Sequence, residues 1–165
     1  MTALILSDLN PEEFDRWWAW ATREYASEHV KFGDWTPEEA PERAQTEFRN
    51  MIPEGVKTPG HYLYALEDPE RKVVVGVVWF RADRGPAAPR PVAVFVLHLL
   101  VYEEFRRKGF GAQGMALIEA RARALGFDTV ALQVLGDNAG AIALYEKTGY
   151  HASNLRMTKH LGPPS

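Results

Sequence analysis

The sequence contains no cysteine. This absence excludes disulfide bonds, thiolate metal sites and a cysteine nucleophile. No apolar run approaches the roughly 20 residues that span a bilayer, and no secretory signal is visible, so we expect a cytoplasmic protein with no membrane partner. The five histidines lack metal-ligand spacing, and a net charge of −3 lacks the basic excess of nucleic-acid-binding domains. We therefore expect no metal and no nucleic-acid partner.

The length of 165 residues and the hydrophobic content of 46% are typical of one globular domain, so residues 1–165 are predicted to form a single domain. The period of the apolar residues alternates between helical and extended along the chain. Helices are predicted over residues 10–30, from about 36–41 to 52, over 109–126 and over 138–148. Strands are predicted over 61–67, 73–80, 92–101, 129–135 and 154–160, with another at 3–7, and the proline-rich stretch 83–91 is predicted to be irregular. This order predicts an α+β (α/β mixed) fold, a central twisted mixed β-sheet flanked by helices.

The most informative segment runs from Val101 to Ala112, after a buried strand and at the start of a helix. Gly109 and Gly111 let the backbone approach a ligand closely, and the first helical turn leaves N–H donors free. The run from Arg106 to Lys108 adds positive charge in an acidic chain. Together these features suit a pyrophosphate, although a solvated basic turn with glycines for tight packing remains an alternative.

Two motifs in this order resemble those of the GNAT superfamily of N-acetyltransferases. Arg106-x-x-Gly109-x-Gly111 is similar to the family's motif A and follows Leu99-Leu100-Val101, as that motif follows an apolar strand. The stretch from Asn138 to Tyr150 resembles motif B, Asn-x-x-Ala-x-x-Leu-Tyr-x-Lys-x-Gly-Phe/Tyr. The resemblance covers residues 92–160 well and implies the acyl-CoA N-acyltransferase (GNAT) fold, with direct transfer of an acetyl group from acetyl-CoA to an amine in a ternary complex.

The resemblance also implies a cofactor site for acetyl-CoA. Amides of the glycine turn would hold the pyrophosphate, and backbone groups of a bulged strand would pair with the pantetheine. Asn138 of motif B would contact the cofactor arm. The implied residues are Leu99, Leu100, Val101, Arg106, Arg107, Lys108, Gly109, Phe110, Gly111, Ala112, Asn138, Ala141 and Tyr145. Core packing of Leu99 and Val101 and helix capping by Asn138 are alternatives that do not exclude these roles.

Two residues are candidates for proton transfer. Tyr145 resembles the family's general acid, because a phenol keeps its proton at neutral pH and can share it with a departing thiolate. The alternative is an aromatic side chain on a buried stripe. Many GNAT enzymes use a strand glutamate, or a water chain, as the base. Here the strand over 92–101 has no carboxylate, and His98 is its only titratable side chain. His98 is therefore either the base or a hydrogen-bonded core histidine.

The acceptor is expected to be the primary amine of a small molecule. A protein N-terminus or lysine, and a non-catalytic CoA-binding module, remain alternatives, and a homodimer is left open. Aromatic and acidic side chains between Trp17 and Glu39 could receive a cationic amine, although core packing of the tryptophans and a solvated face of acidic residues is the favoured interpretation.

Overall fold

The computed structural model describes residues 2–83 and 92–164. The chain divides into two compact units, Met1–Gln133 and Val134–Ser165. The predicted irregular stretch 83–91 lies outside the described residues apart from Asp83, which ends a strand. Among the described residues, no helix combines the length and the apolar character that crossing a membrane requires.

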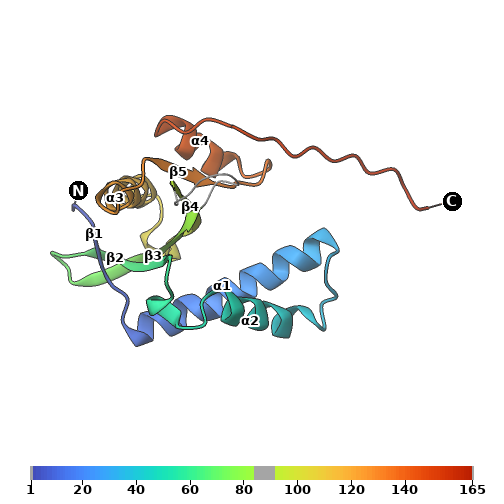
Figure 1. Cartoon of the computed structure of the whole chain (residues 1–165), viewed down its shortest axis with the longest axis horizontal. Helices are drawn as coiled ribbons and strands as arrows, with labels where there is room; N and C mark the ends of the chain where they lie inside the picture. Colours follow the sequence, from blue (N-terminus) through green and yellow to red (C-terminus); the bar gives the residue numbers. More distant parts are fainter. Residues whose placement is uncertain (1, 84–91, 165) are drawn as a thin grey trace. The chain divides into compact units, whose positions relative to one another are not determined.

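The first unit is built on a five-stranded sheet with the order β1-β2-β3-β4-β5 (Figure 1). The strands are β1 (Ile5–Asp8), β2 (His61–Asp68), β3 (Val73–Asp83), β4 (Ala93–Val101) and β5 (Thr129–Leu132). Neighbouring strands from β1 to β4 are antiparallel, and β4 pairs with β5 in parallel. The predicted α+β fold with a mixed sheet is confirmed.

The helices of this unit begin where the sequence signals predict. Helix α1 (Pro11–Phe32) is capped by Asn10, whose side-chain oxygen accepts the Glu13 N–H at 2.9 Å. Helix α2 (Ala40–Met51) follows a reciprocal pair of hydrogen bonds between Thr36 and Glu39, and α3 (Phe110–Ala124) starts directly after Gly109. Two short 3₁₀ turns, η1 (Gly55–Lys57) and η2 (Glu103–Phe105), join these elements to the strands.

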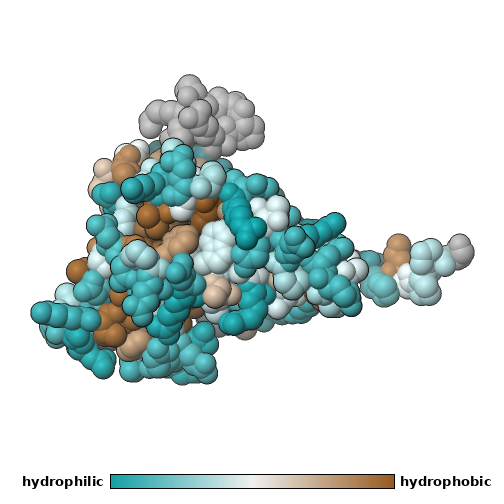
Figure 2. Space-filling view, turned by 90° about the horizontal axis from the view of Figure 1, so that it is seen from below, coloured by the Kyte–Doolittle hydropathy of each residue, from teal (hydrophilic) through white to brown (hydrophobic). Residues whose placement is uncertain are grey.

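The helices cover both faces of the sheet, with α1 and α2 on one face and α3 on the other (Figure 1). Trp17 of α1 and Phe48 of α2 are fully buried against Trp79 of β3. On the opposite face, Phe110 of α3 packs with Leu66 of β2. Hydrophilic side chains dominate the face shown in Figure 2, with hydrophobic ones in small patches, because most large apolar groups are used in these two cores.

Two strand predictions need correction. Strand β5 ends at Leu132 rather than at residue 135, and no strand forms over 154–160, since residues 151–164 have no regular secondary structure. Leu155, Met157 and Leu161 are 78–89% exposed. Alternating apolar residues make a segment compatible with a strand, but a strand also needs a neighbouring backbone to complete its hydrogen bonds, and in its own unit this segment finds none.

Candidate functional site

The first component of the candidate site is an unpaired stretch of β4. Strand β5 pairs with β4 only from Ala93 to Val96, opposite Thr129–Leu132. On the β3 side, pairing continues to Val101. From Leu97 to Val101, therefore, β4 has no strand partner on its β5 side among the residues that the structure describes. Backbone groups directed to that side are available to a ligand.

The alternation of an antiparallel ladder decides which residues direct their backbone groups to this open side. The N–H of Tyr102 donates to the Val75 carbonyl at 2.9 Å, so the backbone groups of Tyr102 and of Leu100 point toward β3. The close approach of Gly76 agrees, because a Cβ built on it would lie 2.0 Å from the Leu100 carbonyl oxygen. Leu99 and Val101 consequently turn their N–H and C=O groups toward the open side.

In this geometry one residue of the predicted backbone site differs from the other two. Leu99 and Val101 have the orientation that the prediction requires, whereas Leu100 is turned toward β3 and its side chain lies in the core under α1. The Val101 carbonyl is already engaged, because it accepts a hydrogen bond from Nε of Arg106 at 3.1 Å. Among the described residues, Leu99 is therefore the position at which both the N–H and the C=O face the open side without a strand partner.

A bulge lies at the start of this stretch. Trp79 and Phe80 are consecutive on β3, but their partners on β4 are His98 and Val96, so Leu97 is an extra residue. A bulge increases local twist and bends its strand, which helps β4 diverge from the short β5. The bulge that the resemblance implies is present at Leu97, two residues before Leu99.

The second component is the N-terminus of α3. The Gln113 N–H donates to the Gly109 carbonyl at 3.3 Å and is the first amide to enter the helical ladder. By helix geometry the amides of Phe110, Gly111 and Ala112 are left without intrahelical partners. No side chain of the described residues caps this end, and three free donors together with the helix dipole are features that favour an anion.

Backbone conformation and charge support this assignment. Gly109 has φ 76° and Arg107 has φ 60°, and the left-handed region is unfavourable for a residue with a side chain such as arginine. Arg106, Arg107 and Lys108 are all exposed. Phe110 differs from these exposed basic residues, because its side chain is buried in the core and only its backbone amide faces the turn. The structure thus brings the predicted glycine turn, the cations and the open side of β4 together in one continuous segment.

His98 lies next to the bulge, and its ring packs against four aromatic side chains, those of Trp17, Trp20, Phe48 and Trp79. The Trp17 indole N–H donates to Nδ1 of His98 at 3.2 Å. Burial lowers the pKa of His98 to about 4, so the ring is neutral at pH 7. This geometry favours the interpretation of His98 as a hydrogen-bonded core histidine, because the lone pair of Nδ1 is already engaged.

The second unit holds the remaining predicted residues on α4 (Ala139–Lys147). Asn138 caps this helix, and its side-chain oxygen accepts the Ala141 N–H at 3.1 Å, which confirms the capping interpretation and occupies the Ala141 amide. The ring of Tyr145 lies 5.9 Å from that of Tyr150, and burial raises the pKa of Tyr145. Tyr145 therefore keeps its proton at neutral pH, as a general acid must.

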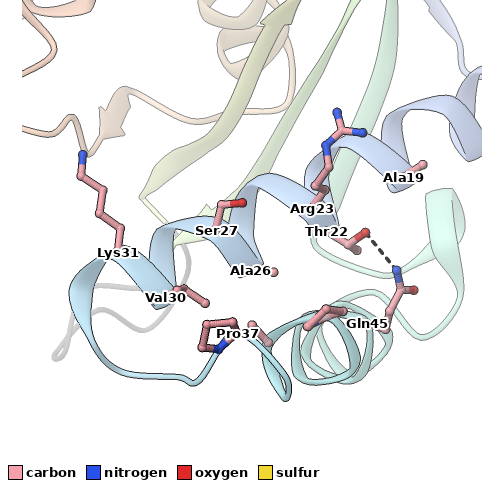
Figure 3. Close-up of a pocket in the computed structure, with 11 residues that line it drawn as sticks. Ala19, Thr22, Arg23, Ala26, Ser27, Val30, Lys31, Pro37 and Gln45 are labelled. Atoms are coloured by element: carbon pink, nitrogen blue, oxygen red, sulfur yellow. Dashed lines mark hydrogen bonds between the residues drawn. The ribbon is translucent and has the colours of Figure 1, made fainter.

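A groove of about 660 Å³ lies between α1 and α2 (Figure 3). Its walls are largely small apolar side chains such as Ala26, Val30 and Ala40, and the hydrogen bond from Gln45 Nε2 to Thr22 Oγ1 (3.0 Å) crosses its floor. None of the predicted cofactor or proton-transfer residues lines this groove. Of the tryptophans considered for the acceptor, Trp17 is fully buried and Trp35 nearly so, whereas Trp18 and Trp20 are partly buried against the core.

Sequence reasoning missed two features of the site. The position of the bulge at Leu97 depends on strand pairing, which no local pattern encodes. The bond from Arg106 to the Val101 carbonyl is also tertiary, although an arginine five residues after a strand end is a weak signal for it. No group of three or more histidine, aspartate or glutamate side chains suited to a metal occurs among the described residues.

Comparison with known proteins gives a consistent result. The model of the Acetyltransferase (GNAT) family matches residues 12–150. The uncharacterized N-acetyltransferases YycN and YdgE of Bacillus subtilis are 35% and 34% identical to this chain, and each alignment covers 96% of this chain and 99% of the relative. The crystal structure of YycN superposes with a TM-score of 0.83 over 97% of this chain and 99% of YycN.

Proposed function

Because the chain belongs to the GNAT acetyltransferase family, we propose that it transfers an acetyl group from acetyl-CoA to the primary amine of a small molecule. The observation that supports this proposal most is the continuous segment from Leu97 to Ala112. It joins the open side of β4 to the uncapped N-terminus of α3. One segment thereby offers backbone pairing to an extended amide-containing arm and N–H donors to a diphosphate.

The residues present fit such a donor. The amides of Phe110, Gly111 and Ala112 and the charges of Arg107 and Lys108 would hold the pyrophosphate. The N–H and C=O of Leu99 would pair with the pantetheine arm, and Arg106, bonded to the Val101 carbonyl, would add charge at the end of the strand. A second-motif contact from the Asn138 amide group remains part of the proposal, since only its oxygen is used in the cap.

The proposed chemistry is a single direct transfer. The neutral amine attacks the thioester carbonyl carbon, the C–N bond forms and the C–S bond breaks. The departing sulfur takes the Tyr145 hydroxyl proton, and Tyr145 regains a proton from solvent. The amine nitrogen loses one proton to water. No acyl-enzyme on cysteine is available, because the chain has no cysteine.

The test is release of free CoA thiol from acetyl-CoA in the presence of a library of amines, with calorimetry of CoA binding measured in parallel. Small amines are expected to support turnover. If only peptides with free N-termini or lysines react, the acceptor assignment changes to a protein. If CoA binds and no amine reacts, a non-catalytic CoA-binding module is the better explanation.

Tyr145→Phe tests the acid within this assay. We expect kcat to fall about a hundredfold or more while CoA affinity is kept, which is the range typical of a lost general acid. Tyr150→Phe is the matched control, since it removes the neighbouring phenol of the same unit at a position where motif B has phenylalanine or tyrosine. Equal activity of the two variants would remove Tyr145 from the mechanism.

A further inference from the structure

The only polar side chain on β4 is held by a residue of α1. Trp17 is fully buried, and its indole N–H, which can only donate, points at Nδ1 of His98. Nδ1 must therefore accept, and neutral His98 carries its proton on Nε2. The side chain is thus fixed in one tautomer by a helix that packs on the sheet.

This pair lies at the bulge. His98 is the residue after Leu97, and it faces Trp79, its partner on β3, with ring centroids 5.2 Å apart. Trp17 also contacts Trp79, at 5.3 Å. The rings of Trp17, Trp79 and His98 therefore all contact one another, and His98 is the first paired residue of β4 after the bulge. If the bulge moved past His98 toward Leu99, His98 would lose its pairing with Trp79, turn to the opposite face and break the bond to Trp17.

We propose that Trp17 is a positioning residue for acetyl transfer: it holds His98 as the Nε2–H tautomer and thereby keeps the β4 bulge at Leu97, which aims the Leu99 backbone groups at the open side. The inference rests on the proposed function, because the value of that orientation is the binding of the acetyl-CoA arm. His98 is then not the base, and the proton lost by the amine passes to water.

The groups around His98 agree with a fixed neutral ring. Trp17 and Trp20 of α1, Phe48 of α2 and Trp79 of β3 face it, and none of them titrates or carries charge. His61 is bonded to the far side of this cluster through the Trp79 indole N–H, at 3.1 Å. Protonation of His98 on Nδ1 would place two N–H donors against each other, so it would break the Trp17 bond.

Trp17→Phe keeps an aromatic ring and removes the donor. We expect about a fivefold loss of kcat/KM for acetyl-CoA, the scale of one hydrogen bond, together with loss of the single Nε2–H tautomer of His98 in nitrogen-15 NMR, because Nδ1 no longer has a fixed donor. Trp18→Phe is the matched control. It removes the neighbouring indole N–H, which donates to Gln45 Oε1 at 2.7 Å, without touching β4. Equal effects of the two variants on kcat/KM and on the His98 tautomer would overturn the proposal.

His98→Asn separates positioning from base catalysis. Asparagine Oδ1 can accept the Trp17 N–H in place of Nδ1 but cannot serve as a base, so activity within about threefold of the wild type is expected, less than one full hydrogen bond. A hundredfold loss in a folded His98→Asn protein would identify His98 as the base and overturn the proposal.

A measurement on the unmodified protein needs no turnover. Nitrogen-15 NMR of the histidine rings should show His98 as the Nε2–H tautomer with no titration between pH 5 and 8. An Nδ1–H tautomer, or protonation near pH 6.5, would overturn the proposal. The His98 tautomer and the CoA affinity of Trp17→Phe can both be measured without an acceptor. They therefore test the role of Trp17 even if no amine is acetylated and the proposed function is wrong.

Discussion

Gly76 is the glycine whose replacement has the clearest expected cost. A Cβ at this position would lie 2.0 Å from the Leu100 carbonyl oxygen and 3.1 Å from Val101 Cα, and backbone atoms cannot move aside as a side chain can. We expect Gly76→Ala to lower the free energy of unfolding by about 3 kcal/mol, at the upper end of overpacking effects. Denaturant unfolding measures the change. Gly140→Ala is the control, because its Cβ meets nothing within 4 Å in α4 and should be neutral or gain up to about 1 kcal/mol.

The pKa of His98 makes a prediction about stability as a function of pH. Its value is about 4 in the folded protein against an ordinary 6.5, so the unfolded chain binds the proton more tightly. Stability therefore falls as the pH drops from about 6.5 to about 4, by at most about 3 kcal/mol from this residue, and no further below that. Unfolding measured from pH 4 to pH 8 checks the slope. The His98→Asn variant should show a flatter profile, and an unchanged slope would contradict the assignment.

At the level of elements, the N-terminus of α3 combines strain with charge. Arg107 occupies the left-handed region at φ 60°, which glycine adopts at lower energy than residues with a side chain. We expect Arg107→Gly to leave stability unchanged or raise it by up to about 1 kcal/mol, while CoA affinity falls, because the turn relaxes and a cation is lost. Thermal unfolding and calorimetry report the two effects. Arg123→Gln removes a charge near the other end of α3 and should change neither, whereas unchanged CoA affinity in Arg107→Gly would show that the strain has another cause.

The same elements show how far sequence signals reach. Asn10 before Pro11 and Gly109 before Phe110 fix the starts of α1 and α3, because caps and left-handed turns depend on neighbouring residues only. The glycine turn of the candidate site was predictable for this reason. The bulge at Leu97 and the inward orientation of Leu100 were not, since both follow from how β4 pairs with β3 and from how early β5 ends.

At the level of the whole molecule, the resemblance of two motifs predicted the family and the fold, and the match over residues 12–150 runs across the boundary between the two units. The role of His98 needed the tertiary structure, because Trp17 lies 81 residues away in the sequence. The end of the chain needed it as well. Leu155, Met157 and Leu161 alternate as in a strand, yet their side chains are exposed.

Amide hydrogen exchange tests directly whether residues 154–160 lack the predicted strand. Among the described residues, the final backbone hydrogen bond in chain order runs from the Tyr150 N–H to the Tyr145 carbonyl, at 2.9 Å. Amides over residues 151–162 should therefore exchange within about tenfold of an unstructured peptide, while those of buried β3, at Val77 and Val78, should require global opening. Strong protection confined to alternate residues of 154–160 would contradict this expectation, because an edge strand protects only the amides that its single neighbour accepts.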